Sequence, residues 1–456
     1  MREPMRVLVS TGHLGFTPIE RASFEAGVAR IPAVYINDSG SCDIGPYPLG
    51  SDGPHSPAKW QRHDLELLLL ASRRQGVPMI IGSASDTGTN RGVDAFARMI
   101  RDIAREHRLP PFRMARIYSE LSKDLLRDVL RRSRIEGLGG RPDLSPEVLD
   151  RTDRVVAMMG AEPIIEAMDR GADVVIAGRS CDDAIFAAPV MRAGYPRPLA
   201  WLVGKVMECA SFCGEPYMAK ESILGSVDEE GATFEPMHPA QRCTPSSIAS
   251  HCMYERESPY RHAVPGGELD LTECRFIPID DRRTRVTGAK FIASPTTKVK
   301  LEGAGWVGER AVSFAGIRDP LSIQNIGIIL KWSKQKVAER LGEPGESSYR
   351  LYFRVFGRDG VMGEWEPRQA IASHELGIMV EAVASVWEVA EEACHLAMRN
   401  LFYARYPGVK GTAGGAAFAI EEVFRAKPAY SWTINHLLEV EEGMELFPVT
   451  LEGVSA

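Results

Sequence analysis

Short apolar runs alternate with helix-like stretches through the first half of the chain, and this alternation constrains the fold more than any other feature. The runs are rich in Val, Ile, Leu and Met without polar alternation, as in strands buried on both faces of a parallel sheet. The runs are Arg6–Ser10, Ala33–Asn37, Pro78–Gly82, Met114–Tyr118, Val155–Met159 and Ala172–Ala177. Helices are predicted between them at Ile19–Ala29, His63–Gln75, Gly92–Glu106, Lys123–Glu136 and Pro163–Arg170. This order predicts a doubly wound α/β fold with a mostly parallel sheet and right-handed crossovers.

The pattern changes near residue 216, where short strand-like segments replace the strand–helix alternation. Residues Thr297–Glu302 alternate with a period of two, as an antiparallel strand with one solvent-facing side does, and a turn is predicted at Gly303–Gly305. The other predicted elements are strands at Gly225–Phe234, Glu268–Phe276, Arg285–Phe291, Arg310–Ala315, Tyr349–Phe356 and Tyr430–Glu439, and helices at Ser322–Leu341 and Ala370–Ala404. We therefore predict an α/β ligand-binding domain over residues 1–215. An α+β domain with a β-rich start and a long helix is predicted over residues 216–456.

The composition excludes several classes of function. The 456 residues include 54 Lys and Arg against 61 Asp and Glu, without a dense basic run, so nucleic acid and an anionic membrane surface are not expected partners. No apolar stretch is long enough to span a bilayer, and no signal peptide is predicted. The 8 cysteines form no CxxC pair, so neither a zinc ribbon nor a thioredoxin motif is expected. These features predict a cytoplasmic protein with reduced thiols.

Polar loops rich in glycine follow five of the predicted strands. Ligands of open α/β sheets bind beyond the carboxyl ends of the strands, so these loops are expected to line one site. The loops are Thr11–Gly15, Asp38–Pro46, Gly82–Gly88, Gly160–Glu162 and Gly178–Asp183. Each loop alone is also ordinary turn and helix-cap chemistry. Five in succession favour a pocket in which backbone N–H groups approach a carboxylate or a phosphate.

The loops carry neither the G-x-G-x-x-G fingerprint nor a P-loop, so no nucleotide cofactor is predicted. Asp38 and Asp43 flank a tight Gly-Ser turn, where two carboxylates could share a proton or hold Mg²⁺. No spacing in the sequence requires a metal. We predict no cofactor and keep a divalent cation as the open alternative.

Candidate acid–base residues come mainly from these loops. Asp38, Asp182 or Glu162 is the expected base, and His251, near a predicted helix start in the second half, is a further candidate. For the Asp182-Asp183 pair, an N-cap carboxylate with an Arg ion pair is an equally good structural interpretation. His251 taken alone is more often a structural histidine.

Candidate substrate-binding residues surround the expected acid–base groups. Arg179 would hold a substrate carboxylate, and backbone N–H groups at Gly12, Gly40 and Ser83 would stabilise an enolate-like oxyanion. The full predicted set is Thr11, Gly12, His13, Ser39, Gly40, Ser41, Asp43, Ser83, Ser85, Asp86, Arg179 and Lys205.

The order of these motifs resembles the acyclic terpene utilisation (AtuA-like) family. The most specific match is Gly171–Asp182, which is followed by Lys205 and Glu208-Cys209. Further matches are Thr11–Gly15, Asp38–Pro46, Ile80–Ala84, Met159–Pro163, His251, Tyr254-Glu255, Pro265–Gly267, Lys300–Gly303, Gly316–Pro320, Gly360–Glu364 and His374–Gly377. The resemblance covers nearly the whole chain.

The resemblance implies a role in the breakdown of branched acyclic terpenoids through acyl-CoA intermediates, or of small branched dicarboxylic acids. It also implies a small partner protein of about a hundred residues. We therefore expect a homo-oligomeric lyase of the hydro-lyase type that acts on a small branched or unsaturated carboxylate or its CoA thioester.

Two other functions stay open at this point. One is a non-catalytic or partner-dependent binding subunit of a two-component enzyme. The other is a thiol-dependent acyl transferase or hydrolase that uses Cys42 or Cys181 with His13 as its base. Cys42 and Cys181 stand where members of the resembled family often carry Thr, Ala or Val, which argues against an essential thiol.

Overall fold

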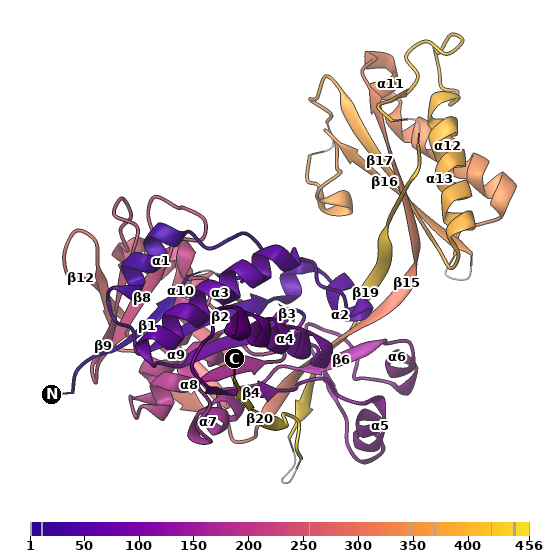
Figure 1. Cartoon of the computed structure of the whole chain (residues 1–456). Helices are drawn as coiled ribbons and strands as arrows, with labels where there is room; N and C mark the ends of the chain where they lie inside the picture. Colours follow the sequence, from indigo (N-terminus) through magenta and orange to yellow (C-terminus); the bar gives the residue numbers. More distant parts are fainter. Residues whose placement is uncertain are drawn as a thin grey trace. The chain divides into compact units, whose positions relative to one another are not determined.

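The computed structural model describes residues 2–10, 12–254, 256–345, 348–368, 370–420, 422–440 and 444–455 (Figure 1). Contacts divide the chain into two compact units, of which the first contains the chain up to Gly305 and again from Trp432. The second unit is Trp306–Ser431. The predicted domain boundary at residues 215 and 216 falls inside the first unit, because β8 (Ile223–Val227) pairs with β1 (Met5–Val9) and extends its sheet.

A ten-stranded sheet forms the centre of the first unit in the described part of the chain. Across the sheet the strands are β12 (Arg275–Pro278), β13 (Thr284–Thr287), β9 (Gly231–Pro236), β8, β1, β2 (Val34–Gly40), β3 (Met79–Asp86), β7 (Val174–Ala177), β4 (Phe112–Ile117) and β20 (Val449–Val454). Five adjacent strands, β1, β2, β3, β7 and β4, are parallel to one another. Antiparallel strands extend the sheet at both edges. The predicted α/β class, with a doubly wound parallel centre and a second α+β region, is confirmed.

Helices cover both faces of this sheet, because successive strand residues point to opposite sides. Val7 and Val34 pack on one face with α7 (Glu162–Asp169), α8 (Asp182–Arg192) and α9 (Arg197–Met207). Leu8 and Tyr35 pack on the other face with α1 (Arg21–Val28), α3 (Ala58–Gln75) and α4 (Asn90–Glu106). The chain leaves β3 toward α4 and β7 toward α8, on opposite faces, so these neighbouring strands form a topological switch point.

The parallel strand predicted at Val155–Met159 is wrong. Residues Arg154–Ala157 form β6, which pairs antiparallel with β15 (Lys298–Ile317) outside the parallel sheet. A short apolar run buried on both sides has the same sequence pattern in either setting, so periodicity cannot separate them. The strand that precedes Glu162 therefore does not belong to the sheet that carries the other predicted loops.

The turn predicted at Gly303–Gly305 is also wrong, because β15 passes through it as one strand. A Cβ atom on Gly303 would lie 2.7 Å from Cβ of Ile434, and one on Gly305 would lie 2.3 Å from the carbonyl oxygen of Arg151. These glycines permit close packing of the backbone and do not turn the chain.

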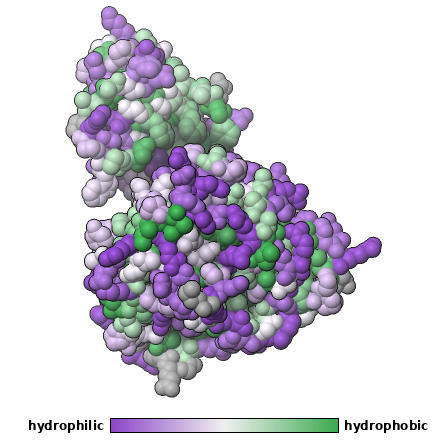
Figure 2. Space-filling view, turned by 90° about the vertical axis from the view of Figure 1, so that its left-hand side faces the viewer, coloured by the Kyte–Doolittle hydropathy of each residue, from purple (hydrophilic) through white to green (hydrophobic). Residues whose placement is uncertain are grey.

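In the second unit, α12 (Ile326–Leu341) and α13 (Trp387–Phe402) pack with β16 (Tyr349–Phe356) and β17 (Leu376–Ala384) around one core. The helix predicted at Ala370–Ala404 is therefore wrong over its first part, where β17 lies. Its apolar residues fit helical spacing, but they also alternate with a period of two. Figure 2 shows hydrophobic residues gathered on part of the surface of this unit.

The remaining elements connect and flank these layers. They are α2 (Tyr47–Ser51), α5 (Lys123–Arg132), β5 (Glu136–Gly137), α6 (Pro146–Asp150), α10 (Pro245–Met253), β10 (Arg261–Val264), β11 (Gly267–Asp270), β14 (Lys290–Ala293), α11 (Pro320–Gln324), β18 (Ala417–Phe418), β19 (Phe424–Glu439), and the short 3₁₀ helices η1 (Cys42–Ile44), η2 (Ala210–Cys213) and η3 (Gly363–Trp365). Among the described residues, no helix is both long and apolar enough to cross a membrane.

Candidate functional site

A cavity of about 430 Å³ lies in the first unit, beyond the carboxyl ends of β1, β2 and β7. This is the edge at which open α/β sheets bind ligands. The described residues that line it are Gly12, His13, Phe16, Thr17, Asp38, Ser41, Asp43, Ile44, Asp182, Glu208, Cys209, Ser211, Phe212, Tyr217, Ala219, Lys220 and Tyr254.

Asp38 and Asp182 are two interacting carboxyl groups in the wall of this cavity, and Oδ1 of each is buried without a hydrogen-bond partner among the described residues. Asp38 is only 3% exposed, and burial followed by the charge of Asp182 raises its pKa well above the usual range. Burial also raises the pKa of Asp182, although the Arg179 charge opposes it. Because two adjacent buried carboxyl groups cannot both ionise readily, the pair loses its protons at a higher pH than two separate carboxyl groups would.

Helix α8 positions Asp182 without using it as the cap. The N-cap residue is Cys181, and its side chain makes no capping hydrogen bond. The neighbouring Asp183 lies 2.5 Å from Nε2 of His262, so each carboxylate of the first turn has its own partner. The N-cap part of the structural interpretation is therefore wrong, whereas its Arg ion pair is present, with Nη1 of Arg179 3.7 Å from Oδ1 of Asp182.

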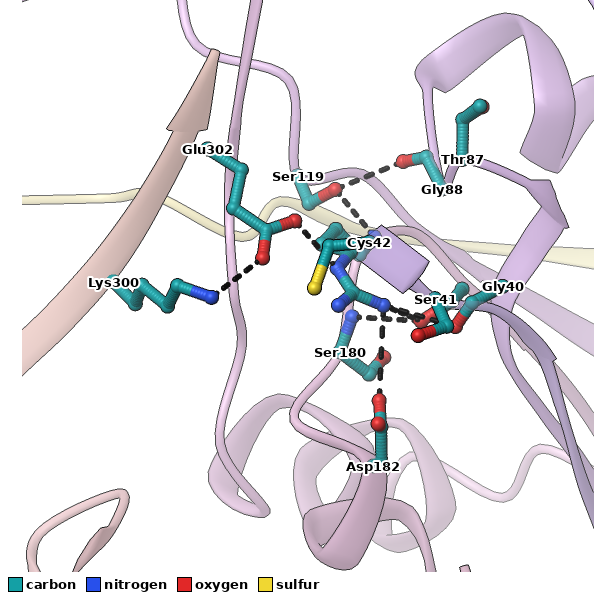
Figure 3. A network of polar contacts seen from close by, with 12 residues as sticks. Gly40, Ser41, Cys42, Thr87, Gly88, Ser119, Ser180, Asp182, Lys300 and Glu302 are labelled. Atoms are coloured by element: carbon teal, nitrogen blue, oxygen red, sulfur yellow. Dashed lines mark hydrogen bonds and ion pairs between the residues drawn. The ribbon is translucent and has the colours of Figure 1, made fainter. Parts of the chain in front are cut away.

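Nη1 of Arg179 lies 3.7 Å from Oδ1 of Asp182, and Figure 3 shows the polar network to which Asp182 belongs. Its Nε donates to Oε2 of Glu302 at 2.8 Å, and its Nη1 donates to the carbonyl oxygen of Gly40 at 2.9 Å and to Oγ of Ser83 at 3.1 Å. The guanidinium thus holds the loops after β2, β3 and β7 together. Two of its three nitrogens are occupied by these protein groups, which limits its capacity to hold a substrate carboxylate.

Glu302 keeps the Arg179 contact ionic. Burial works to raise the pKa of this carboxyl group, but Arg179 and Lys300 lower it to about 2. Nζ of Lys300 donates to Oε1 of Glu302 at 2.8 Å (Figure 3). Glu302 was not among the predicted site residues, because it comes from a strand far along the chain.

The end of β3 holds three residues in left-handed backbone conformations: Ser83 (φ 44°), Ser85 (φ 60°) and Asp86 (φ 71°). Such strain in residues other than glycine is concentrated at functional sites. Gly40 fits against this segment because a Cβ atom there would lie 2.3 Å from the carbonyl oxygen of Asp86. The N–H of Ser83 donates to the carbonyl of Gly178 at 3.1 Å and is therefore not available to an oxyanion.

His13 enters the cavity wall from the loop after β1, and Asp86 orients it. Nε2 of His13 lies 2.8 Å from Oδ1 of Asp86. Asp86 also accepts hydrogen bonds from Oγ and N of Ser56, at 2.5 and 2.8 Å. Although burial works against it, these contacts hold the pKa of Asp86 below its usual value. The carboxylate therefore fixes the imidazole ring.

Glu208, at the carboxyl end of α9, contributes a third carboxyl group to the cavity. Burial and the charge of Asp183 raise its pKa to about 8, although the charge of Lys205, whose Nζ contacts Oε1 of Glu208, works to lower it. Lys205 was predicted to bind substrate. It is only 4% exposed, however, and does not line the cavity. The i,i+3 spacing of Lys205 and Glu208 on a helix is the signal from which Glu208 could have been selected.

His251 lies outside the cavity lining. The ring is 4% exposed and stacks between Phe212 and Tyr254, with ring centroids 6.5 and 5.0 Å away. Burial, followed by the charge of Lys205, lowers its pKa to about 3. A histidine in this setting stays neutral at physiological pH and serves the aromatic wall of the cavity.

The structure separates the remaining predicted residues. The side chain of Glu162 is 68% exposed and lies 3.8 Å from Arg197. Ser39 is fully buried beside the carbonyl of Leu14, and Thr11 lies outside the described residues. The predicted residues that the cavity brings together are Gly12, His13, Asp38, Ser41, Asp43 and Asp182.

The surroundings of Cys42 and Cys181 disfavour the thiolate form of either side chain. Burial raises the pKa of Cys42 and of Cys181, so both thiols are held in their unreactive protonated form. Within the described ranges, no three His, Cys, Asp or Glu side chains are placed so that they could hold a metal ion.

The fold and the cavity together define an α/β protein with a carboxyl-lined pocket at the carboxyl edge of a doubly wound sheet. Residues 58–433 match the sequence model of the acyclic terpene utilisation family protein AtuA. The chain therefore belongs to the AtuA family, which confirms the resemblance drawn from its motifs. No curated protein and no solved structure matches the chain.

Proposed function

We propose that this protein is a hydro-lyase that adds water to, or removes it from, a small branched carboxylate or its CoA thioester. The observation that carries the proposal is the Asp38–Asp182 pair, two interacting carboxyl groups in the wall of the cavity whose pKa values are both raised by burial. Such a pair holds one carboxylate and one carboxylic acid close to a bound ligand, which are the two forms that acid–base catalysis needs. The family description, acyclic terpene utilisation, supports a branched substrate.

In the dehydration direction, the ionised member of the pair removes the proton from the carbon next to the carboxylate or thioester. The electron pair of that C–H bond forms the C=C bond as the bond from the β-carbon to the hydroxyl oxygen breaks. Glu208, whose pKa is about 8 and which is therefore mostly protonated at neutral pH, donates a proton to the departing hydroxide, which leaves as water. Hydration runs through the same steps in reverse.

The test is exchange of the α-hydrogen with solvent. In D₂O, the wild-type protein incubated with branched 3-hydroxy acids or their CoA thioesters is expected to introduce deuterium at the α-carbon, read by NMR. Asp182→Asn is expected to abolish this exchange while leaving ligand binding nearly intact, because the amide fills the same space but cannot take the proton. Asp169→Asn, on an exposed carboxylate paired with Arg192, is the matched control and should exchange like the wild type.

Exchange by Asp182→Asn at the wild-type rate would remove Asp182 from the mechanism. The competing thiol mechanism makes a different prediction: alkylation of Cys42 or Cys181 would stop turnover, and Cys→Ser variants would be inactive. Full activity of both Cys→Ser variants would exclude it.

A further inference from the structure

Lys220 lines the same cavity and lies in the connection between η2 and β8. Its backbone is left-handed, with φ of +63°, and its carbonyl accepts a hydrogen bond from the N–H of Glu20 at 3.3 Å. Its Nζ donates to the carbonyl oxygen of His13 at 3.1 Å. A strained backbone and two long-range hydrogen bonds thus hold one lysine side chain in the cavity wall.

The Lys220 ammonium has no acidic partner. In the described part of the chain it forms no ion pair, and the nearby Asp64 already accepts from the N–H groups of Gly15 at 2.9 Å and of Ile19 at 3.0 Å. Burial lowers the pKa of Lys220 to about 8, although the charge of Asp64 works in the opposite direction. A desolvated cation that faces a cavity without an ion-pair partner of its own is stabilised when an anion binds beside it.

The rest of the cavity limits how many charges that anion can carry. Lys220 is the one lysine or arginine among the described lining residues, whereas Asp38, Asp43, Asp182 and Glu208 supply four carboxyl groups. If the ligand carried a second carboxylate, that carboxylate would lie near one of these four carboxyl groups. No second lysine or arginine among the described lining residues could bind it. Electrostatic repulsion therefore favours a ligand with a single negative charge.

The apolar wall lies beside the cation. The Phe16 ring centroid is 5.8 Å from Nζ of Lys220, and Phe212 and Tyr217 stack with their centroids 5.1 Å apart. Both stacked rings remain more than half exposed, at 55% and 58%. The cavity thus offers one cation and an aromatic surface, and a monocarboxylate with an apolar chain complements both.

We propose that Lys220 binds the carboxylate of the substrate, and that the site takes branched monocarboxylates in preference to dicarboxylates. This inference rests on the proposed function where it calls the ligand a substrate. The anion-binding site itself does not depend on the reaction. Lys220 thus takes the carboxylate-binding role that was expected of Arg179. No pattern in the sequence marks Lys220 for that role.

The experiment measures binding without turnover, by isothermal titration calorimetry with 3-methylcrotonate as the monocarboxylate and methylfumarate as the dicarboxylate. The wild-type protein should bind the monocarboxylate more tightly, by about tenfold or more. Lys220→Met should weaken that binding by roughly tenfold or more, since a hydrogen bond to a charged group contributes about 1.5–3 kcal/mol. Lys220→Arg should retain part of the affinity, because it keeps the charge.

Lys59→Met is the matched control, because Nζ of the exposed Lys59 also lies 5.8 Å from an aromatic ring centroid, that of Trp60, and does not line the cavity. It should bind 3-methylcrotonate like the wild type, and circular dichroism should show all variants folded. Equal binding by Lys220→Met and the wild type, or tighter binding of methylfumarate, would overturn the inference. Binding that depends on Lys220 without any α-hydrogen exchange would instead contradict the hydro-lyase proposal and leave the anion site standing.

Discussion

Glu208 illustrates at the scale of one residue how the site affects the stability of the fold. Its pKa is raised from 4.5 to about 8 in the folded protein, by burial and by Asp183. Between these two values the unfolded chain is ionised while the folded protein still holds the proton. Folding therefore binds a proton in this window, and the free energy of unfolding falls as the pH rises through it.

Replacing Glu208 by Gln should remove this pH dependence. Thermal unfolding followed from pH 5 to pH 8 should show a smaller loss of Tm in Glu208→Gln than in the wild type, and the variant should be the more stable protein at pH 8. Gln can still accept a hydrogen bond from Lys205, so the contact between them is kept. Parallel Tm curves for the two proteins would show that Glu208 is ionised throughout the window.

At the scale of the element, β15 shows what glycine contributes within a strand. A Cβ atom on Gly305 would lie 2.3 Å from the carbonyl oxygen of Arg151. A Cβ atom on Gly316 of the same strand would have its nearest neighbour 3.8 Å away. The two glycines thus differ in whether the fold has room for a methyl group.

Gly305→Ala should therefore lower the free energy of unfolding by about 1–3 kcal/mol, the usual cost of overpacking. Gly316→Ala is the control and should leave stability unchanged or raise it slightly, because alanine loses less backbone entropy on folding. Chemical denaturation measures both. A Gly305→Ala protein as stable as the wild type would mean that the Arg151 segment shifts easily.

Elements also differ in how far the sequence predicts them. The strands from β1 to β4 were predictable, because apolar runs that end in glycine-rich loops are typical of buried parallel strands, and their order placed Gly12, Asp38 and Asp182 near one edge. The partner of β6 was not predictable, because pairing depends on β15, which lies far along the chain. Glu302 reaches the site on β15, far along the chain, and the family match at Lys300–Gly303 contains it without giving it a role. No local pattern marks Lys220.

At the scale of the whole molecule, the pair Arg179–Glu302 joins residues 123 positions apart within the first unit. Both side chains are at most 5% exposed. Removing one charge from a buried ion pair leaves the other without compensation, which is more damaging than the loss of the contact itself.

Glu302→Gln should accordingly destabilise the protein by about 3–5 kcal/mol near neutral pH. The wild type should have this contribution in full above pH 4.5 and lose it as the pH falls toward 2, because the pKa of Glu302 is depressed in the folded state. Glu268→Gln, which removes an exposed partner of Arg261, is the control and should cost no more than about 1 kcal/mol. Similar losses in both variants would contradict a special role for the buried pair.

The division of the first unit into two stretches of chain has a consequence for biosynthesis. The sheet of this unit ends in β20, which pairs with β4, whereas the second unit is one continuous stretch. Because the ribosome releases the chain from its amino end, every residue of the second unit emerges before β20 does. During synthesis, β4 therefore remains an open sheet edge while more than three hundred residues are translated, and an open edge of this kind can pair with other chains.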